Sequence, residues 1–156
     1  MCAKSIIFYT FAAKMTNMKQ ITIKVAWNNS AFEGLVSSET SYGEMKIVTK
    51  DFNDIIDMGE AELKIGFDGY TEFGLELPEW YKNKEYEFVY KFQDVTAMLK
   101  AYSSYVSLAA ISRETGINSA LLSHYANGLK VPRNKQQKII VSGLHRIGAL
   151  LSKCTI

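Results

Sequence analysis

Cysteine, proline and long apolar runs are all scarce in this sequence of 156 residues. The two cysteines, Cys2 and Cys154, stand at opposite ends of the chain. Their spacing excludes a disulfide scaffold and a zinc site built on a Cys-x-x-Cys pair, and it favours a reducing cytosol. No run approaches the roughly 18–20 apolar residues that a membrane helix needs. We therefore expect a cytoplasmic protein with no membrane partner.

The first residues of the chain have a composition different from the rest. A short apolar run over 6–13 follows a single lysine, which is typical of a weak signal peptide. The run is too short and too polar for that role, and Met15 and Met18 are both plausible start sites. We expect residues 1–17 to be an N-terminal extension that is disordered or results from a misassigned start codon.

Acidic residues are also scarce in one part of the chain. Residues 94–156 hold 2 acidic against 8 basic residues, a net charge of +6. Residues 1–93 hold 14 acidic against 10 basic residues, a net charge of −4. Such asymmetry is typical of chains in which one part binds nucleic acid. We therefore expect two domains, residues 18–92 and residues 94–153.

The first of these domains is expected to be a small α+β domain of order βββαβ. Apolar and polar residues alternate over 20–27, 31–36, 45–48 and 85–92, which predicts four strands. Asn28-Asn29-Ser30 predicts a tight turn between the first two. Between the last two strands, helical spacing predicts an amphipathic helix of about four turns, with Thr49 as its N-cap and its end near the glycines of 66–69. Residues 70–83 are expected to be a loop, and the helix to cover a mainly antiparallel sheet.

Nothing in this domain predicts catalysis. It contains no histidine, and its first strand carries no carboxylate. A two-metal nuclease needs carboxylates that project from strands toward bridging metal ions. We therefore expect no enzyme, no metal and no cofactor, and an active RNase H-like nuclease is the least favoured alternative. The acidic helix face is either a solvated surface or a docking site for a basic partner.

The second domain is expected to be all-α. Asp94 can cap a helix that begins at Val95. Two further helices, over 107–115 and 118–127, flank Gly116, where a positive φ costs little only for glycine. Asn118 would cap the second of them, and Ala109 and Ala110 are small enough for a close helix crossing. This pattern predicts a helix-turn-helix followed by a last helix over 134–152.

The second helix of that pair would be the recognition helix, which approaches base edges in the major groove. Its outward side predicts five residues for base readout: Ser119, Ala120, Ser123, His124 and Asn127. Basic residues around it predict five phosphate contacts: Arg113, Lys130, Arg133, Lys135 and Lys138. The alternative is a helical hairpin with no role in DNA binding.

The last helix carries an apolar stripe at helical spacing, formed by Ile140, Leu144, Ile147 and Leu151. Part of the stripe must cover the helical core. The remainder is expected to pair with a second copy of the chain, because DNA readers of this class act as dimers on paired half-sites. The alternative is that the whole stripe is intramolecular core.

Four segments of the sequence are similar to parts of HicB family antitoxins: YEFVYKF at 86–92, DVTAML at 94–99, LSHYANGLKVPR at 122–133 and LHRIG at 144–148. The resemblance covers about residues 18–152. It implies a degenerate RNase H-like N-terminal domain and a Cro/repressor-type helix-turn-helix domain. One departure lies at 38–43, where SETSYG keeps only the glycine of a Pro-Asp-Leu-Pro-Gly-Cys-like run found in many members.

The function that this resemblance implies is that of an antitoxin in a type II toxin–antitoxin pair. Such an antitoxin neutralises a small ribonuclease toxin of the HicA kind with its first domain and represses its own operon with its second. Toxins of that kind are small and basic, which suits the acidic balance of the first domain. The alternative is an orphan helix-turn-helix regulator whose N-terminal domain dimerises or senses a ligand.

Overall fold

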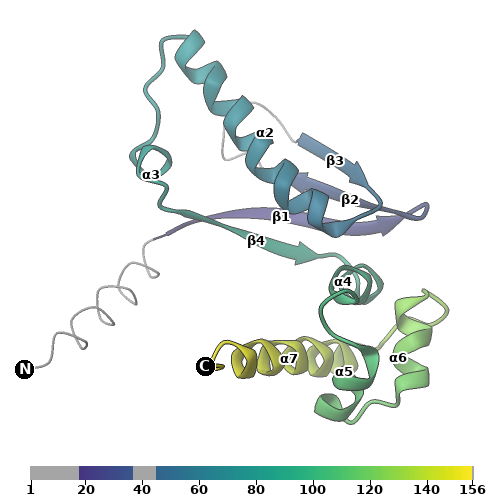
Figure 1. Cartoon of the computed structure of the whole chain (residues 1–156). Coiled ribbons are helices and arrows are strands. Elements are labelled where there is room, and N and C mark those ends of the chain that lie inside the picture. Colours follow the sequence, from purple (N-terminus) through teal and green to yellow (C-terminus); the bar gives the residue numbers. More distant parts are fainter. Residues whose placement is uncertain (1–17, 37–44, 156) are drawn as a thin grey trace, which may run out of the picture. The chain divides into compact units, whose positions relative to one another are not determined.

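The computed structural model describes residues 18–36 and 45–155 (Figure 1). The expected N-terminal extension, residues 1–17, and the segment 38–43 lie outside these described residues. The chain is a mixed α+β protein, as the sequence predicted. Its described residues form two compact units: residues 18–25, 33–36 and 45–91 in the first, and residues 26–32 and 92–155 in the second.

Four strands form one sheet in the order β3-β2-β1-β4: β1 (Lys19–Asn28), β2 (Ala31–Val36), β3 (Met45–Thr49) and β4 (Tyr86–Phe92). Asn29 and Ser30 have φ values of 47° and 62°, so the predicted tight turn between β1 and β2 is confirmed. The amide of Lys19 donates to the carbonyl oxygen of Glu85 over 2.8 Å, at the starts of β1 and β4. These two strands therefore run in the same direction, and the sheet contains one parallel pair (Figure 1).

Helix α2 (Phe52–Glu72) covers one face of this sheet. The alternation predicted for β1 is confirmed, since Ile21, Ile23 and Val25 are buried. Gly59 allows the helix to lie close on the sheet, because a Cβ atom there would come within 2.9 Å of Ile23 Cδ1.

Both predicted ends of α2 were wrong. The N-cap is Asp51, whose carboxylate accepts from the amide of Asn53 at 2.9 Å, whereas Thr49 is the last residue of β3. The helix also continues past Gly66 and Gly69, and the first glycine with positive φ after it is Gly74, at 70°.

Aromatic packing explains why the helix does not end at those glycines. Phe67 is buried, and its ring lies 5.4 Å from Trp80 and 4.1 Å from Tyr81, measured between ring centroids. Both partners belong to the one-turn helix α3 (Glu79–Lys82). The loop expected over 70–83 therefore contains the end of α2 and a further helical turn. Burial of Phe67 offsets the low helix propensity of the glycines on either side.

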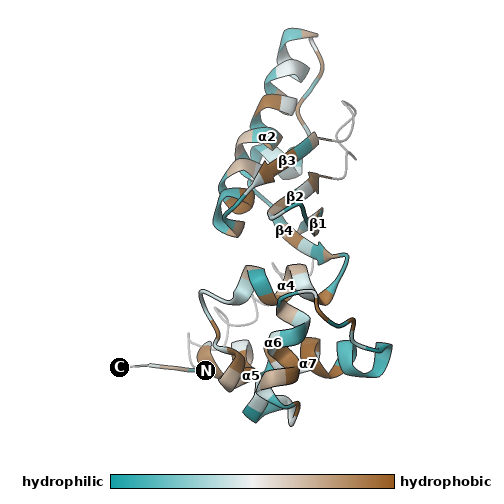
Figure 2. Cartoon of the chain, turned by 90° about the vertical axis from the view of Figure 1, so that its right-hand side faces the viewer, coloured by the Kyte–Doolittle hydropathy of each residue, from teal (hydrophilic) through white to brown (hydrophobic). Residues whose placement is uncertain are grey.

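The second unit contains four helices among its described residues: α4 (Val95–Tyr102), α5 (Leu108–Thr115), α6 (Ser119–Ala126) and α7 (Asn134–Leu151). Helix α5 packs against α6 and α7, and α4 packs against α6. The predicted cap of α4 is confirmed, since Asp94 accepts from the amide of Ala97 at 2.7 Å. Seven buried side chains form the core, and they come from all four helices: Val95, Met98, Leu99, Ile111, Leu122, Tyr125 and Ile140. Figure 2 shows the backbone of these helices coloured by hydropathy.

None of the helices in the described part of the chain is long and apolar enough to cross a membrane.

Candidate nucleic-acid interface

The turn between α5 and α6 is fixed by its own residues. Gly116 has a φ of 73°, as predicted, and its amide donates to the carbonyl oxygen of Ser112 at 2.9 Å. The hydroxyl of Thr115 donates to the carbonyl oxygen of Ile111 at 2.6 Å and accepts from the amide of Ile117 at 3.2 Å. Asn118 then caps α6 by accepting from the amide of Ala120 at 2.8 Å. The angle between the two helices is therefore set by local hydrogen bonds.

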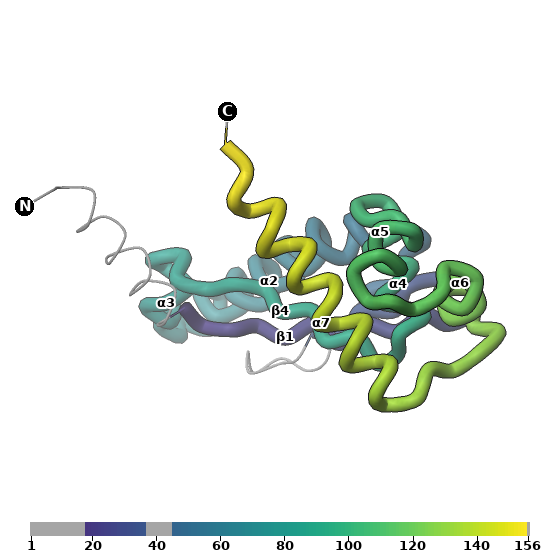
Figure 3. The backbone as a smooth tube through the Cα atoms, turned by 90° about the horizontal axis from the view of Figure 1, so that it is seen from below, coloured from purple at the N-terminus to yellow at the C-terminus, as the bar shows by residue number. Residues whose placement is uncertain are grey.

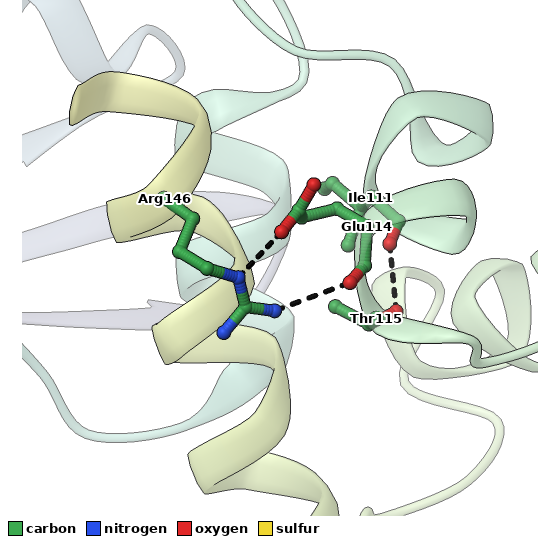
Figure 4. Close-up of polar contacts among 4 residues, drawn as sticks. All are labelled: Ile111, Glu114, Thr115 and Arg146. Carbon is green, nitrogen blue, oxygen red and sulfur yellow. Dashed lines mark hydrogen bonds and ion pairs between the residues drawn. The ribbon is translucent and has the colours of Figure 1, made fainter. Parts of the chain in front are cut away.

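Helix α7 holds the end of α5 through an ion pair that the sequence did not predict (Figure 4). The guanidinium of Arg146 donates through Nε to the carboxylate of Glu114 and through Nη2 to the carbonyl oxygen of Glu114, the latter at 3.1 Å. The two residues are 32 positions apart in sequence, so no local pattern relates them. Arg146 is consequently engaged within the protein.

The close helix crossing lies elsewhere than predicted. Ala109 is exposed, so the expected crossing at Ala109 and Ala110 was wrong for the first of these residues. Gly143 of α7 is buried against α5, and a Cβ atom at this position would overlap with Cγ2 of Thr115. Glycine at 143 therefore lets the backbone of α7 approach the last turn of α5.

The five residues predicted for base readout lie together on one side of α6 or at its end. Leu122 and Tyr125 are buried on the other side. Ser119, Ala120 and Asn127 are exposed, and Ser123 and His124 are half-buried. Asn127 follows the helix as its C-cap, and its side-chain amide donates to Ser123, at 3.0 Å to the carbonyl oxygen and 3.3 Å to the hydroxyl. The side chains on the outward side of α6 are thus small or polar, and two of them, Ser123 and Asn127, are hydrogen-bonded to each other.

The five residues predicted for phosphate contacts are all exposed. Arg113 belongs to α5, Lys130 and Arg133 to the connection between α6 and α7, and Lys135 and Lys138 to the first turns of α7. Within the described part of the chain, none of the five forms an ion pair.

The two carboxylates in the described part of the second unit form no ion pairs with these cations. Glu114 binds Arg146, and Asp94 caps α4. The positive charge predicted from composition therefore remains available at the surface of α5, the connection between α6 and α7, and α7.

Hydrogen bonds hold the connection between α6 and α7 at both of its ends. The carbonyl oxygen of His124 accepts from the amides of Leu129 and Lys130 at 2.9 and 3.3 Å, and Gly128 has a φ of 70°. At the other end, the side chain of Gln137 donates to the carbonyl oxygen of Pro132 at 3.0 Å. This connection, light green in Figure 3, lies at the edge of the helical unit. The sequence pattern predicted no role for the apolar residues of this connection.

The first unit presents a different surface. Residues 52–79 hold eight acidic residues and one basic residue, and five of the acidic ones are exposed on α2: Asp54, Asp57, Glu60, Asp68 and Glu72. Burial, and then the charge of Glu60, raise the pKa of Tyr86 above its ordinary value. Within the described residues, no three His, Cys, Asp or Glu side chains are grouped as a metal site would require.

Comparisons with protein families, with curated proteins and with solved structures find no match to this chain.

Proposed function

We propose that α5, the turn at Gly116 and α6 form a helix-turn-helix that binds operator DNA. The observation that carries this proposal is the set of five exposed cations, without ion-pair partners among the described residues, on the elements that precede and follow a capped helix with a polar outward side. Cations at phosphates position a protein on the duplex, and a polar helix face in the major groove reads bases. Ser119, Ser123, His124 and Asn127 are the hydrogen-bonding groups of that face, and Ala120 fits a thymine methyl group.

We further propose that two copies of the chain bind one operator. The predicted apolar stripe of α7 leaves the core toward its end: Ile140 is buried, Leu144 and Ile147 are half-buried, and Leu151 is exposed. Leu150 is exposed beside it. This apolar end supports pairing with a second copy, which would place two recognition helices on half-sites of one duplex.

For the first unit, the proposed partner is a small basic ribonuclease toxin, as the resemblance to HicB family antitoxins implies. Supporting this are the carboxylates of α2 and the exposed apolar side chains nearby, Ile65 and Phe73. A basic protein that docked there would meet charge complementarity around an apolar centre. The chain then acts as a non-enzymatic antitoxin and repressor of its own operon.

Two measurements test the operator and partner proposals separately. The full chain is mixed with a pool of random-sequence DNA duplexes, and bound duplexes are recovered over several rounds. Enrichment of one sequence motif, lost in the His124→Ala and Asn127→Ala variants, is the expected result. Failure to enrich any motif would contradict the operator proposal.

The partner is tested with the product of any short reading frame that adjoins the gene. Its binding to the full chain is expected to weaken when Asp57 and Glu60 are replaced by Asn and Gln. If no adjoining product binds, the alternative of an orphan regulator, whose first unit dimerises or senses a ligand, is favoured instead.

A further inference from the structure

The segment Gly128–Arg133 holds two large apolar side chains out of the core. Leu129 and Val131 are 71% and 86% exposed. Such exposure would be unremarkable in a loose loop, but this segment is hydrogen-bonded to His124 at one end and to Gln137 at the other. Pro132, between the exposed Val131 and Arg133, is buried and anchors the backbone. The two side chains are therefore presented by a fixed backbone.

The neighbours of these side chains in the sequence are cations. The order is Leu129, Lys130, Val131, Pro132, Arg133, so apolar and basic groups alternate along the exposed segment. The backbone of a nucleic acid strand has the matching alternation, in which an apolar sugar edge separates each phosphate from the next. Basic residues bind phosphate oxygens, and apolar side chains are suited to the carbon–hydrogen edge of a deoxyribose.

We propose that this segment is a second, sequence-independent DNA contact, in which Leu129 and Val131 pack on deoxyribose edges while Lys130 and Arg133 bind the adjacent phosphates. The inference rests on the proposed DNA binding by α6, which the segment directly follows. We assign the sugar–phosphate backbone of duplex DNA as the occupant of this surface. A second copy is less favourable, because the cations on either side of Val131 would repel the cations of the same segment in that copy.

The test separates the apolar contribution from the ionic one. The probe is a fluorescently labelled 30-base-pair duplex of mixed sequence, because the proposed contact does not depend on bases. Dissociation constants of the full chain are measured at several salt concentrations for wild type, Val131→Ser, Leu129→Ser and Lys130→Gln. Val48→Ser is the matched control, since Val48 is also exposed but belongs to β3 of the first unit.

Val131→Ser and Leu129→Ser are expected to weaken binding about fivefold or more at every salt concentration, with the dependence of log K on log salt unchanged. Lys130→Gln is expected to reduce the magnitude of that slope by about 0.9 for each bound copy, since one counterion fewer is released per copy. Val131→Ile, which keeps an apolar side chain at this position, is expected to bind with the affinity of wild type. Thermal melting of the serine variants is expected to match wild type, because both side chains are exposed.

Three outcomes would overturn the inference. The first is binding by both serine variants within twofold of wild type. The second is a change in their salt dependence. The third is loss of self-association in sedimentation, which would show that a second copy covers these residues. If the wild-type chain fails to bind the duplex at low salt, the proposed DNA binding itself is contradicted, and this result is distinguishable from the other three.

Discussion

At the scale of single residues, the structure rests on contacts that a sequence pattern does not display. Gly143 lies against Thr115, whose hydroxyl is already engaged with Ile111 and Ile117. A β-branched side chain held by two hydrogen bonds cannot rotate away from a new methyl group. The spacing of the glycines gave no reason to distinguish Gly143 from Gly148.

Gly143→Ala is expected to destabilise the second unit by about 1–3 kcal/mol, the usual cost of overpacking a tight core. Gly148→Ala is the control, because no atom lies within 4 Å of a Cβ built there and the position is exposed. Because alanine has a higher helix propensity than glycine, Gly148→Ala is expected to raise the free energy of unfolding by up to about 1 kcal/mol. Urea unfolding followed by circular dichroism measures both, and equal effects of the two substitutions would contradict the close approach.

Arg146 is a basic residue that should not act as a phosphate contact. Its guanidinium is bound by Glu114, so Arg146→Gln is expected to leave the salt dependence of DNA binding unchanged. Lys135→Gln, at an exposed cation of the same helix, is expected to reduce the magnitude of the slope by about 0.9 for each bound copy. Fluorescence anisotropy titrations at several salt concentrations compare the two. A reduced slope for Arg146→Gln would show that the ion pair opens on DNA.

At the scale of elements, local chemistry predicted the boundaries that depend on neighbours in sequence. Asn29 and Ser30, Asp94, Asn118 and Gly116 adopt the turn, cap and exit roles expected of their residue types. Helix α2 could not be delimited in this way. Thr49 and Asp51 are both good caps, and only the extent of β3 decides between them. Its far end depends on rings that follow later in the chain.

The turn between α5 and α6 depends on the left-handed backbone at Gly116. Gly116→Val is expected to cost at least 1–2 kcal/mol, because a β-branched residue strains a φ of 73°. DNA binding is expected to fall with it, while binding of a basic partner by the first unit is kept. Gly116→Asn is the control, since asparagine tolerates this conformation better. Loss of both binding activities in the valine variant would show that the two units do not act independently.

Helix α4 gives the second unit a dependence on alkaline pH. Burial, and then the neighbouring Tyr105, raise the pKa of Tyr102 above its ordinary value of 10.0. The folded chain thus holds the phenolic proton of Tyr102 more firmly than the unfolded chain does. The contribution of the neutral Tyr102 side chain to the free energy of unfolding is therefore present below pH 10 and is lost as pH rises through the folded pKa. Tyr102→Phe is expected to lose less stability than wild type between pH 8 and pH 11. If urea unfolding shows that wild type and Tyr102→Phe lose the same free energy of unfolding over this pH range, the contribution of Tyr102 is contradicted.

At the scale of the whole molecule, the charge division was the most informative property of the sequence. It predicted an acidic and a basic part, and all five predicted cations are exposed in the structure. It could not show that Arg146 is engaged by Glu114, because that pair joins helices 32 residues apart, or that Leu129 and Val131 are held outward, because the charge division carries no information on apolar side chains. Which cations are available is a property of the fold.

The number of available cations makes the salt dependence a measure of how many copies bind. Five phosphate contacts predict a slope of log K against log salt of about −4.5 for one copy, and about −9 when two copies bind one duplex. Replacing Leu150 and Leu151 by Ser is expected to halve the slope, because their exposed end of α7 is the proposed contact between copies. Sedimentation of the free variant as a monomer is the accompanying control. A slope near −4.5 in both proteins would contradict paired binding, and a slope near zero would contradict the phosphate contacts themselves.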